Sequence, residues 1–453
     1  MRYLKLLLCV IATAVVVWLL NHHVEGVNGP SYYQWIWQQL AWPRVLVGFA
    51  VAIVPFALGH ALVSFGRWPQ RRALKAVALS LFLLQLVAAG LREDPFSLEV
   101  GAHVIQHPVA TSYFTDAVAL DAKKDFSLSK WVSDYPKAMS QLGFRSKTKP
   151  PGPILFHLAI VRLYKGHPEA AATVAALLIA LLTSLGVFAV RWFIAVMTGD
   201  PERGFWGASL FALMPGIVII HPMFDQLYPI VTCAMVGLWA IALKERRKLA
   251  ALACGMVIAA STFFIFTLLT LGILLVALTV MLWLWDAEQG RTRNLLTQLG
   301  WALAGLLLIY AALWLTMHYD PIATFRSAWQ GEEHFKSWVA KRTYPQSIYW
   351  DLEDFALGMG WVAPLLLLFG LLRAQPRQER AIAIAGFLQV VTVAVTALLA
   401  GETARLFMFM VPLVLIPMDR ELAARGPWAR TLVFACALAV LIAVRRNLIF
   451  IGI

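Results

Sequence analysis

Long apolar runs recur along this 453-residue chain, and they constrain its fold more than any other feature. Many are about 17–25 residues long, enough for a helix to cross a hydrocarbon layer of ~30 Å. A helix closes its backbone hydrogen bonds internally, so such runs are stable in lipid. The sequence therefore predicts an all-α polytopic membrane protein. We expect about thirteen transmembrane helices, at residues 4–20, 44–65, 74–91, 168–190, 204–221, 227–243, 249–265, 267–285, 295–317, 351–372, 381–400, 406–418 and 430–445.

The composition supports a membrane protein. Hydrophobic residues make up 60% of the chain and charged residues only 14%, whereas a soluble chain is typically about half apolar and a quarter charged. The net charge of +13 lies largely in short clusters between the apolar runs, so it predicts membrane orientation and no nucleic-acid partner. The four cysteines all fall inside apolar runs, which is typical of small core residues.

The basic clusters predict an orientation in the membrane. With the N-terminus in the cytoplasm, nearly every compact cluster lies on the cytoplasmic side, including KERRK at 244–248. Arg445 and Arg446 break this pattern and leave the orientation of the last helix open. The apolar run from Pro151 to Tyr164 is too short to span, so we predict an interfacial helix on the outer surface.

This topology divides the chain into three parts: N-terminal transmembrane helices at 1–91, an outer loop with an interfacial helix at 92–167, and a transmembrane core at 168–453. The core has further outer loops near 225, at 318–350 and at 401–405. All the unusual polar segments then lie on the non-cytoplasmic face. We expect this to be the periplasmic or extracellular face of a bacterial inner membrane.

The outer loop at 92–167 is the one long polar stretch, and Lys149-Pro150-Pro151-Gly152 lies near its end. Two prolines bar a helix through Lys149 and stiffen the backbone where the lysine projects. Gly152 allows a ligand to approach the chain closely. A lysine at a membrane surface suits a phosphate headgroup as a point charge. The alternative is a Lys149 that only anchors the start of an interfacial helix.

The order of several motifs resembles the GT-C glycosyltransferases, polytopic enzymes that use polyprenyl- or dolichyl-phosphate sugars. The pattern is most like family 39, which includes protein O-mannosyltransferases and the aminoarabinose transferase of lipid A. The resemblance runs from about residue 92 to 418 and implies a GT-C fold. The motifs that carry it are Lys149-Pro150, Phe224-Asp225-Gln226, Glu333-His334, the aromatic and acidic run from Tyr349 to Phe355, and Gly401-Glu402-Thr403-Ala404-Arg405.

Two acids of the outer loop are candidates for the catalytic base of such an enzyme. The Asp-Glu-x-x-Tyr element of the family has no full counterpart, because Glu93-Asp94-Pro95 occupies its place and Tyr113 precedes Asp116. Position relative to the membrane favours Asp94. Spacing to Lys149 favours Asp116, which we prefer.

The resemblance implies an inverting transfer, in which a carboxylate takes the proton of an acceptor hydroxyl as that hydroxyl attacks the sugar. Lys149 would neutralise the leaving polyprenyl phosphate, with Arg145 and Arg405 behind it. Asp225 would orient the sugar or the lipid, glycan or protein acceptor. No cofactor is implied, and the sequence does not indicate a divalent metal. Further substrate-binding residues would be Tyr113, Glu333, His334 and Glu402.

Three other functions stay open. A transporter or flippase of lipid-linked saccharide usually places charges at mid-membrane on broken helices, often in inverted repeats. This chain has few such charges and no evident repeat. A glycan ligase or polymerase would use the same kind of lipid-phosphate donor, and the size of the outer loop does not separate it from a single-sugar transferase. A non-catalytic membrane scaffold is the remaining alternative.

Overall fold

The protein is almost entirely helical in a computed structural model. The structure describes residues 2–29, 34–91, 98–285, 290–335, 344–373, 375–399 and 402–449. Within these ranges, the only sheet is an antiparallel pair of two-residue strands, β1 (Ile36–Trp37) and β2 (Leu448–Ile449). Nine helices in the same ranges are long and apolar enough to cross a membrane. The prediction of an all-α integral membrane protein is confirmed.

These nine helices correspond to nine of the predicted spans. Two of them, α12 and α14, qualify together with the 3-10 turns that precede them, η3 (Phe224–Leu227) and η4 (Thr267–Thr270). The nine are α1 (Arg2–Asn21), α2 (Trp42–Ser64), α3 (Gln70–Gly90), α9 (Pro168–Thr198), α12 (Tyr228–Lys244), α14 (Leu271–Trp285), α15 (Arg291–Met317), α19 (Arg377–Val395) and α22 (Pro427–Asn447).

The other four predicted spans differ from the expectation. Residues 204–221 form two short helices, α10 (Phe205–Phe211) and α11 (Pro215–Val218). Pro215 is the cause, because the residue before a proline avoids the helical region and Met214 is extended (ψ 127°). Residues 351–372 lie on α17 (Gln346–Met359) and α18 (Val362–Leu371), which are bent by 101°. The last two lie on α13 (Lys248–Phe264) and α21 (Val411–Ala423), so thirteen long helices are not found in the described ranges.

The chain forms two compact units. Unit 1 contains residues 1–101, 177–230 and 343–452, and unit 2 contains residues 102–176 and 231–342. In unit 1, α1 packs against α22, α2 against α3, and α21 against both α10 and α18. The predicted polar motifs divide between the units: Asp225, Glu402 and Arg405 belong to unit 1, and Asp116 and Lys149 belong to unit 2.

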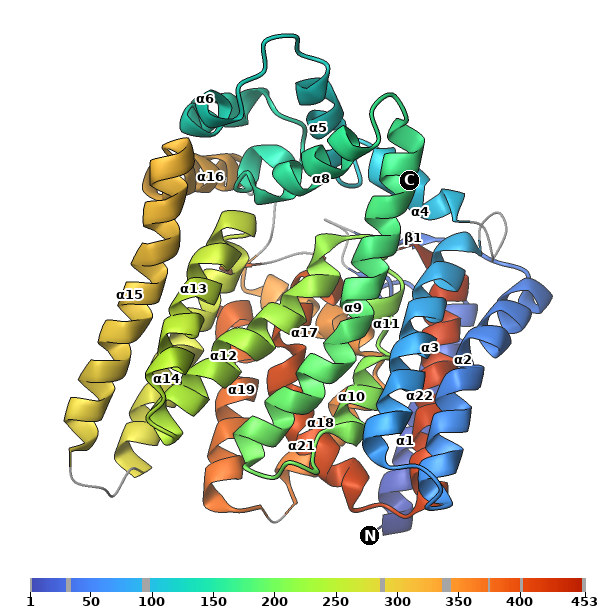
Figure 1. Cartoon of the computed structure of the whole chain (residues 1–453). Helices are drawn as coiled ribbons and strands as arrows, with labels where there is room; N and C mark the ends of the chain where they lie inside the picture. Colours follow the sequence, from blue (N-terminus) through green and yellow to red (C-terminus); the bar gives the residue numbers. More distant parts are fainter. Residues whose placement is uncertain are drawn as a thin grey trace. The chain divides into compact units, whose positions relative to one another are not determined.

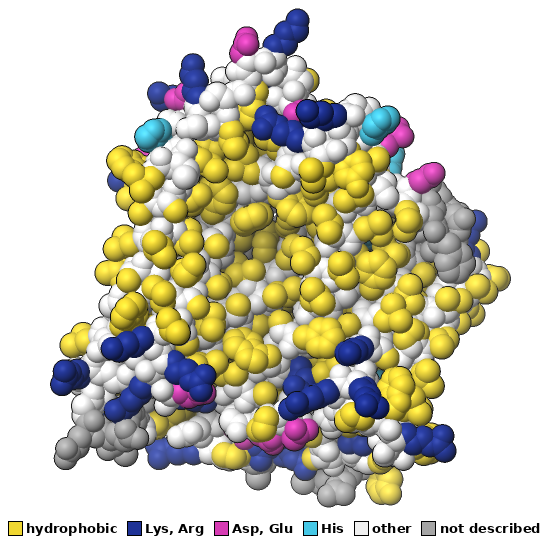
Figure 2. All heavy atoms as spheres, in the orientation of Figure 1, with side chains coloured by type: hydrophobic (Ala, Val, Ile, Leu, Met, Phe, Trp, Pro, Cys, Tyr) yellow, Lys and Arg dark blue, Asp and Glu magenta, His cyan; other side chains and the backbone are white. Residues whose placement is uncertain are grey.

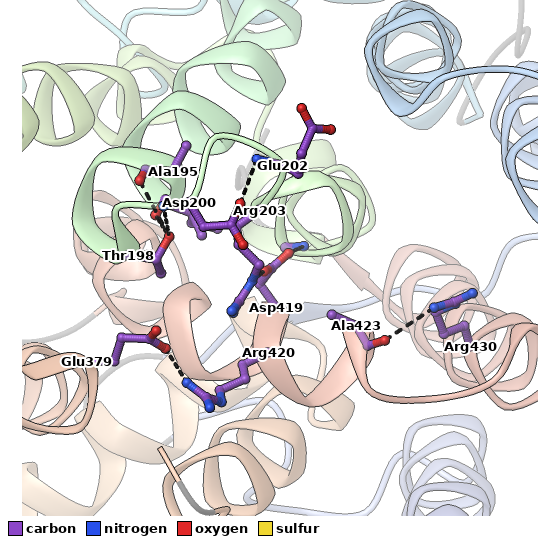
Figure 3. Close-up of polar contacts among 12 residues, drawn as sticks. Ala195, Thr198, Asp200, Glu202, Arg203, Glu379, Asp419, Arg420, Ala423 and Arg430 are labelled. Atoms are coloured by element: carbon purple, nitrogen blue, oxygen red, sulfur yellow. Dashed lines mark hydrogen bonds and ion pairs between the residues drawn. The ribbon is translucent and has the colours of Figure 1, made fainter. Parts of the chain in front are cut away.

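A buried carboxylate ties α10 to α21 in unit 1. Asp419 of α21 is fully buried and lies beside Arg203 (Figure 3). Its carboxylate accepts hydrogen bonds of 2.9 Å from Arg203 Nε and from the backbone N–H of Gly207. A buried charge needs such partners, and the first turn of a helix favours an anion. The contact fixes the start of α10, and through it the segment that leads to Asp225.

Arg445 and Arg446, the exception to the orientation rule, end α22 and are both buried. Arg445 Nε donates to the carbonyl of Ala88, near the end of α3, and Arg446 donates to the Asn21 side chain at the end of α1. The Arg446 guanidinium also lies 4.3 Å from the Trp42 ring centroid. Helix C-terminal ends favour cations. Contacts within the protein therefore account for these two arginines, so they are not evidence on the orientation of the last helix.

The apolar part of unit 2 includes α13, α14, α15 and most of α12. α13 packs along α15 (Figure 1), and α15 keeps most of its surface exposed. Exposed side chains on α14 and α15 are mainly apolar, among them Val276, Val280, Leu303 and Leu307. Figure 2 shows an apolar surface across this face, with basic side chains gathered along its lower edge. Such a surface is suited to lipid.

Unit 2 also contains a subdomain of short helices, which we call the loop subdomain. It comprises α5 (Tyr113–Asp121), α6 (Leu128–Ser133), α7 (Tyr135–Ala138), η1 (Met139–Gln141), η2 (Ser146–Thr148), α8 (Gly152–Leu163) and α16 (Pro321–Phe335), and α4 (Glu99–Gln106) precedes it. Its buried core contains Leu120, Tyr135, Ile154, Leu158 and Ala328. At 12 residues, α8 is a short apolar helix and lies across the direction of α15 (Figure 1).

Candidate functional site

The first turn of α5 holds the chain segment that leads to Lys149. Both carboxylate oxygens of Asp116 accept from the backbone N–H of Gly143, at 3.1 Å each. One residue before α5, the hydroxyl oxygen of Ser112 accepts from the backbone N–H groups of Arg145 (2.9 Å) and Ser146 (3.1 Å). Side-chain acceptors therefore satisfy three backbone N–H groups of the irregular segment from Gly143 to Ser146.

The backbone of Lys149 is fixed on both sides. Its N–H donates to the Ser146 carbonyl at 3.0 Å, and its own carbonyl accepts from the Tyr135 hydroxyl at 2.8 Å. Its conformation is extended (φ −122°, ψ 154°), as expected before a proline. Tyr135 is fully buried, and burial raises its pKa well above the usual value, so the hydroxyl stays a donor.

Basic groups dominate the segment that ends at Lys149. Arg145 Nε donates to the Val109 carbonyl at 3.4 Å. Two cations lie near the Phe144 ring centroid, the Arg145 guanidinium at 5.4 Å and the Lys147 ammonium at 5.6 Å. Lys149 is partly buried, and among the residues that the structure describes no carboxylate lies within ion-pair distance of its ammonium group. This segment can accept an anion.

α16 covers the same segment in the loop subdomain. It packs against η2, and Gly331 lies next to Thr148. Glu333 is exposed and accepts from Trp329 Nε1 at 2.7 Å, one turn earlier on α16. The backbone of His334 belongs to the same helix, while its side chain lies outside the described part of the chain. Tyr113 is partly buried and packs against the core of the loop subdomain.

The second group of predicted residues lies in unit 1 and centres on Arg405. Its guanidinium contacts Asp225 Oδ2 from Nη1 at 3.4 Å and pairs with Glu402 through Nη2. The Arg405 side chain is only 6% exposed, against 14% for Asp225 and 33% for Glu402. Two carboxylates therefore contact one buried guanidinium, and we call these three residues the ionic trio.

A further acid, Asp354 of α17, holds the short helix α20 (Thr403–Leu406) that carries Arg405. Asp354 is fully buried and accepts from Trp35 Nε1, from the backbone N–H of Ala404 (2.6 Å) and from the Thr403 hydroxyl (3.2 Å). The Thr403 hydroxyl shares its single proton with the Asp351 carbonyl, which lies 2.7 Å from Oγ1. These contacts of one buried carboxylate hold α20 in a fixed position.

Asp225 is held by its neighbour Gln226. The Gln226 amide donates to Gln85 Oε1 at 3.0 Å and to the Ile217 carbonyl. Gln85 on α3 in turn donates to the Ala180 carbonyl (3.1 Å) and the Ser184 hydroxyl (3.2 Å) on α9. The turn η3, which carries Asp225, is thus anchored to the helices of unit 1 by amide groups.

The structure therefore brings the predicted residues together as two groups. Asp116, Arg145 and Lys149 belong to the loop subdomain, and Asp225, Glu402 and Arg405 form the trio. Asp94, the alternative base, lies outside the described residues. Within the described ranges, no group of three or more His, Cys, Asp or Glu side chains is arranged to hold a metal ion.

Sequence reasoning missed the residues that hold these groups in place. Ser112 and Tyr135 do so in the loop subdomain, and Asp354 and Gln226 do so in unit 1. A partial signal was present in the sequence, because Gln226 and Asp354 belong to motifs that the prediction had already singled out, although it assigned neither residue a role.

Comparisons with known proteins give a similarity in fold only. No family model matches the chain, and no curated protein matches it. Two crystal structures of ArnT from Cupriavidus metallidurans are similar, one in the apo state (TM-score 0.47) and one bound to undecaprenyl phosphate (TM-score 0.46). Each is 14% identical and covers 79% of this chain. The chain spans 60% and 61% of the length of those two structures.

Proposed function

We propose that the protein is an integral membrane glycosyltransferase of the GT-C type, which transfers a sugar from a polyprenyl-phosphate donor to an acceptor hydroxyl. The observation that carries the proposal is the setting of Lys149. Its backbone is fixed by Ser146 and Tyr135, and no described carboxylate pairs with its ammonium group. The motifs that resemble the GT-C family supply the reaction class.

A phosphate attached to a polyprenyl chain suits this setting. An ammonium group recognises phosphate as a point charge, and Arg145 adds a second cation four residues earlier. The N-terminus of α8 begins three residues after Lys149 and also favours an anion. α8 itself is short and apolar, as expected for a helix at the membrane surface, where the phosphate of a lipid donor lies.

The chemistry follows from these groups. The acceptor hydroxyl attacks C1 of the sugar, the C1–O bond to the donor phosphate breaks, and the polyprenyl phosphate leaves with the electron pair. Lys149 stabilises the charge that develops on this phosphate, and a carboxylate takes the proton of the hydroxyl. Asp116 binds one N–H through two oxygens, which leaves acceptor capacity for that proton. Asp94 is the alternative base.

The test uses the full chain in nanodiscs with a panel of radiolabelled polyprenyl-phosphate sugars. Release or transfer of sugar would be compared for the wild type, Asp116→Asn, Asp94→Asn and Lys149→Ala, with Lys147→Ala as the control for loss of a neighbouring cation. Turnover that is lost in Lys149→Ala and retained in Lys147→Ala would support the proposal. Loss in only one of the two aspartate variants identifies the base.

Other outcomes would replace the proposal. Movement of lipid-linked saccharide across the bilayer without turnover of any donor would favour a flippase. Turnover of lipid-linked oligosaccharides but of no single-sugar donor would favour a glycan ligase or polymerase.

A further inference from the structure

The exposed face of α16 carries a stripe of large apolar side chains. Ile322, Phe325 and Trp329 are 63%, 36% and 47% exposed, respectively. At about 100° per residue in a helix, these three side chains fall within about 60° of one another around the helix axis. Arg326 and Gln330 are also exposed, and they lie in the next sector, about 40–80° beyond Ile322. The exposed face of α16 is therefore divided into an apolar side and a polar side.

A third side of α16 packs into the loop subdomain. Thr324 and Ala328 are buried, and Ala328 belongs to the core of the loop subdomain. Around the helix axis, the apolar stripe lies between this packed side and the polar side, at about 100° per residue. A helix with these three sides is suited to a boundary at which protein, lipid and water meet.

The connection to α15 places α16 near the membrane surface. α15 has 27 residues, a length of ~40 Å, which exceeds the ~30 Å of the hydrocarbon layer. Only residues 318–320 separate the two helices, and α16 begins beside that end of α15 (Figure 1). Asp320 Oδ1 accepts from the backbone N–H groups of Ile322 and Ala323 at 2.9 Å each, which fixes the start of α16. Tyr319 is buried, so the connection is also held by packing.

The exposed apolar surface of α15 continues to this connection. Trp314 and Leu315, in the last turn of α15, are 57% and 70% exposed. On α16, Trp329 Nε1 donates to Glu333 at 2.7 Å, so the indole N–H has a partner on its own helix while the ring stays exposed. Indole rings of this kind are typical of the membrane–water boundary. A lipid surface is therefore the partner that suits the stripe on α16.

We propose that Ile322, Phe325 and Trp329 form a membrane-docking surface, through which the loop subdomain contacts the headgroups and upper acyl chains of the lipid. Arg326 and Gln330 face water in this arrangement. Because α16 packs against η2, the lipid contact lies one helix away from the segment that ends at Lys149. The inference goes beyond the proposed function, since neither a donor nor a turnover step enters it.

The test uses spin labels on single introduced cysteines in the full chain, reconstituted in nanodiscs. The four natural cysteines are buried and should not react with the label. Collisions with oxygen report a lipid environment, and collisions with a water-soluble nickel chelate report an aqueous one. We expect the ratio of oxygen to nickel accessibility to be several-fold higher for Ile322→Cys and Trp329→Cys than for Arg326→Cys and Gln330→Cys.

Two further positions of unit 2 calibrate the measurement. Leu303→Cys lies on the exposed apolar surface of α15 and gives the value for lipid. Lys124→Cys lies at an exposed position between α5 and α6 and gives the value for water. Two labelled positions on each side of α16 keep the test decisive when one variant does not fold.

Two results would overturn the inference. Water-like ratios at all four positions of α16 would leave the stripe open to a soluble acceptor or to a second protein. Lipid-like ratios at all four positions would place α16 inside the lipid layer and not at its surface. Neither result bears on the proposed glycosyl transfer, which is tested separately by turnover of a donor.

Discussion

Lys149 and Arg405 are predicted to serve the same phosphate, yet their surroundings differ. Lys149 lies in the loop subdomain, where backbone hydrogen bonds from Ser146 and Tyr135 hold it and no described carboxylate pairs with it. Arg405 lies in unit 1, where Asp225 and Glu402 neutralise it. Hydrogen bonds to the backbone hold Lys149 in place, whereas ion pairs to the side chain hold Arg405.

The difference follows from burial. A partly buried lysine on a flexible stem keeps water at its ammonium group and can remain without a counter-ion. A guanidinium enclosed by protein cannot, since desolvation without a partner costs several kcal/mol. The position of a basic residue in a motif therefore does not tell whether its charge is available to a ligand. Substitutions should distinguish an available cation from one that also holds the fold together.

The largest effect is expected for Arg405→Gln. It leaves two carboxylates without their shared cation, and breaking a buried ion pair in this way costs about 3–5 kcal/mol. Thermal unfolding in detergent should show a clearly lower transition temperature, and adding Glu402→Gln should recover part of the loss. Arg326→Gln, at an exposed arginine of α16, is the control. An unchanged transition in Arg405→Gln would remove the contrast between the two cations.

Lys149→Ala should show the opposite behaviour. Loss of one preorganised electrostatic contact typically lowers turnover by about 10²–10³-fold, so we expect a decrease of about 100-fold in the turnover of the active donor. Stability should be unchanged, because the hydrogen bonds at Lys149 involve only its backbone. Lys147→Ala should retain activity. A loss of stability in Lys149→Ala would mean that its ammonium group also has a structural role.

Much of the fold could be predicted from the sequence, because apolar length is a local property. Nine predicted spans coincide with long apolar helices. Two of the errors arose where the backbone breaks within an apolar run. Pro215 divides one predicted span into two short helices. Gly360 and Trp361, both with positive φ, bend another. Apolar composition alone does not register a backbone break of this kind.

The candidate site was predictable in part for a related reason. Lys149, Asp225 and Arg405 stand in short motifs that can be read along the chain. The residues that hold them, such as Tyr135 and Asp354, act across 14 and 50 residues of sequence, respectively. A contact of that kind depends on tertiary packing, so a single sequence does not reveal it. Nor does a single sequence show that Glu402 forms an ion pair with Arg405.

Acid should weaken the loop subdomain through His157 of α8. Burial lowers the pKa of His157 to about 3, so the folded protein keeps it neutral while the unfolded chain binds a proton below about pH 6.5. Stability is therefore retained above pH 6.5 and lost as the pH falls toward 3. Between pH 7 and pH 5 the loss is about 2 kcal/mol. Unfolding measured at both pH values should show this loss in the wild type and not in His157→Leu.

The smallest effect is expected for Tyr135→Phe, which changes a backbone contact of Lys149 and leaves its side-chain charge unchanged. Tyr135→Phe removes the hydrogen bond to the Lys149 carbonyl and leaves a buried acceptor with one partner fewer, at a cost of about 1 kcal/mol. If that bond positions the lysine, the KM for the donor should rise several-fold while the maximal rate changes less. Trp131→Phe, a ring 5.0 Å from Tyr135 in the same core, tests for a general loosening of the loop subdomain. Equal effects of both variants on KM and stability would assign Tyr135 to the core, and an effect of Tyr135→Phe alone would place Lys149 under backbone control.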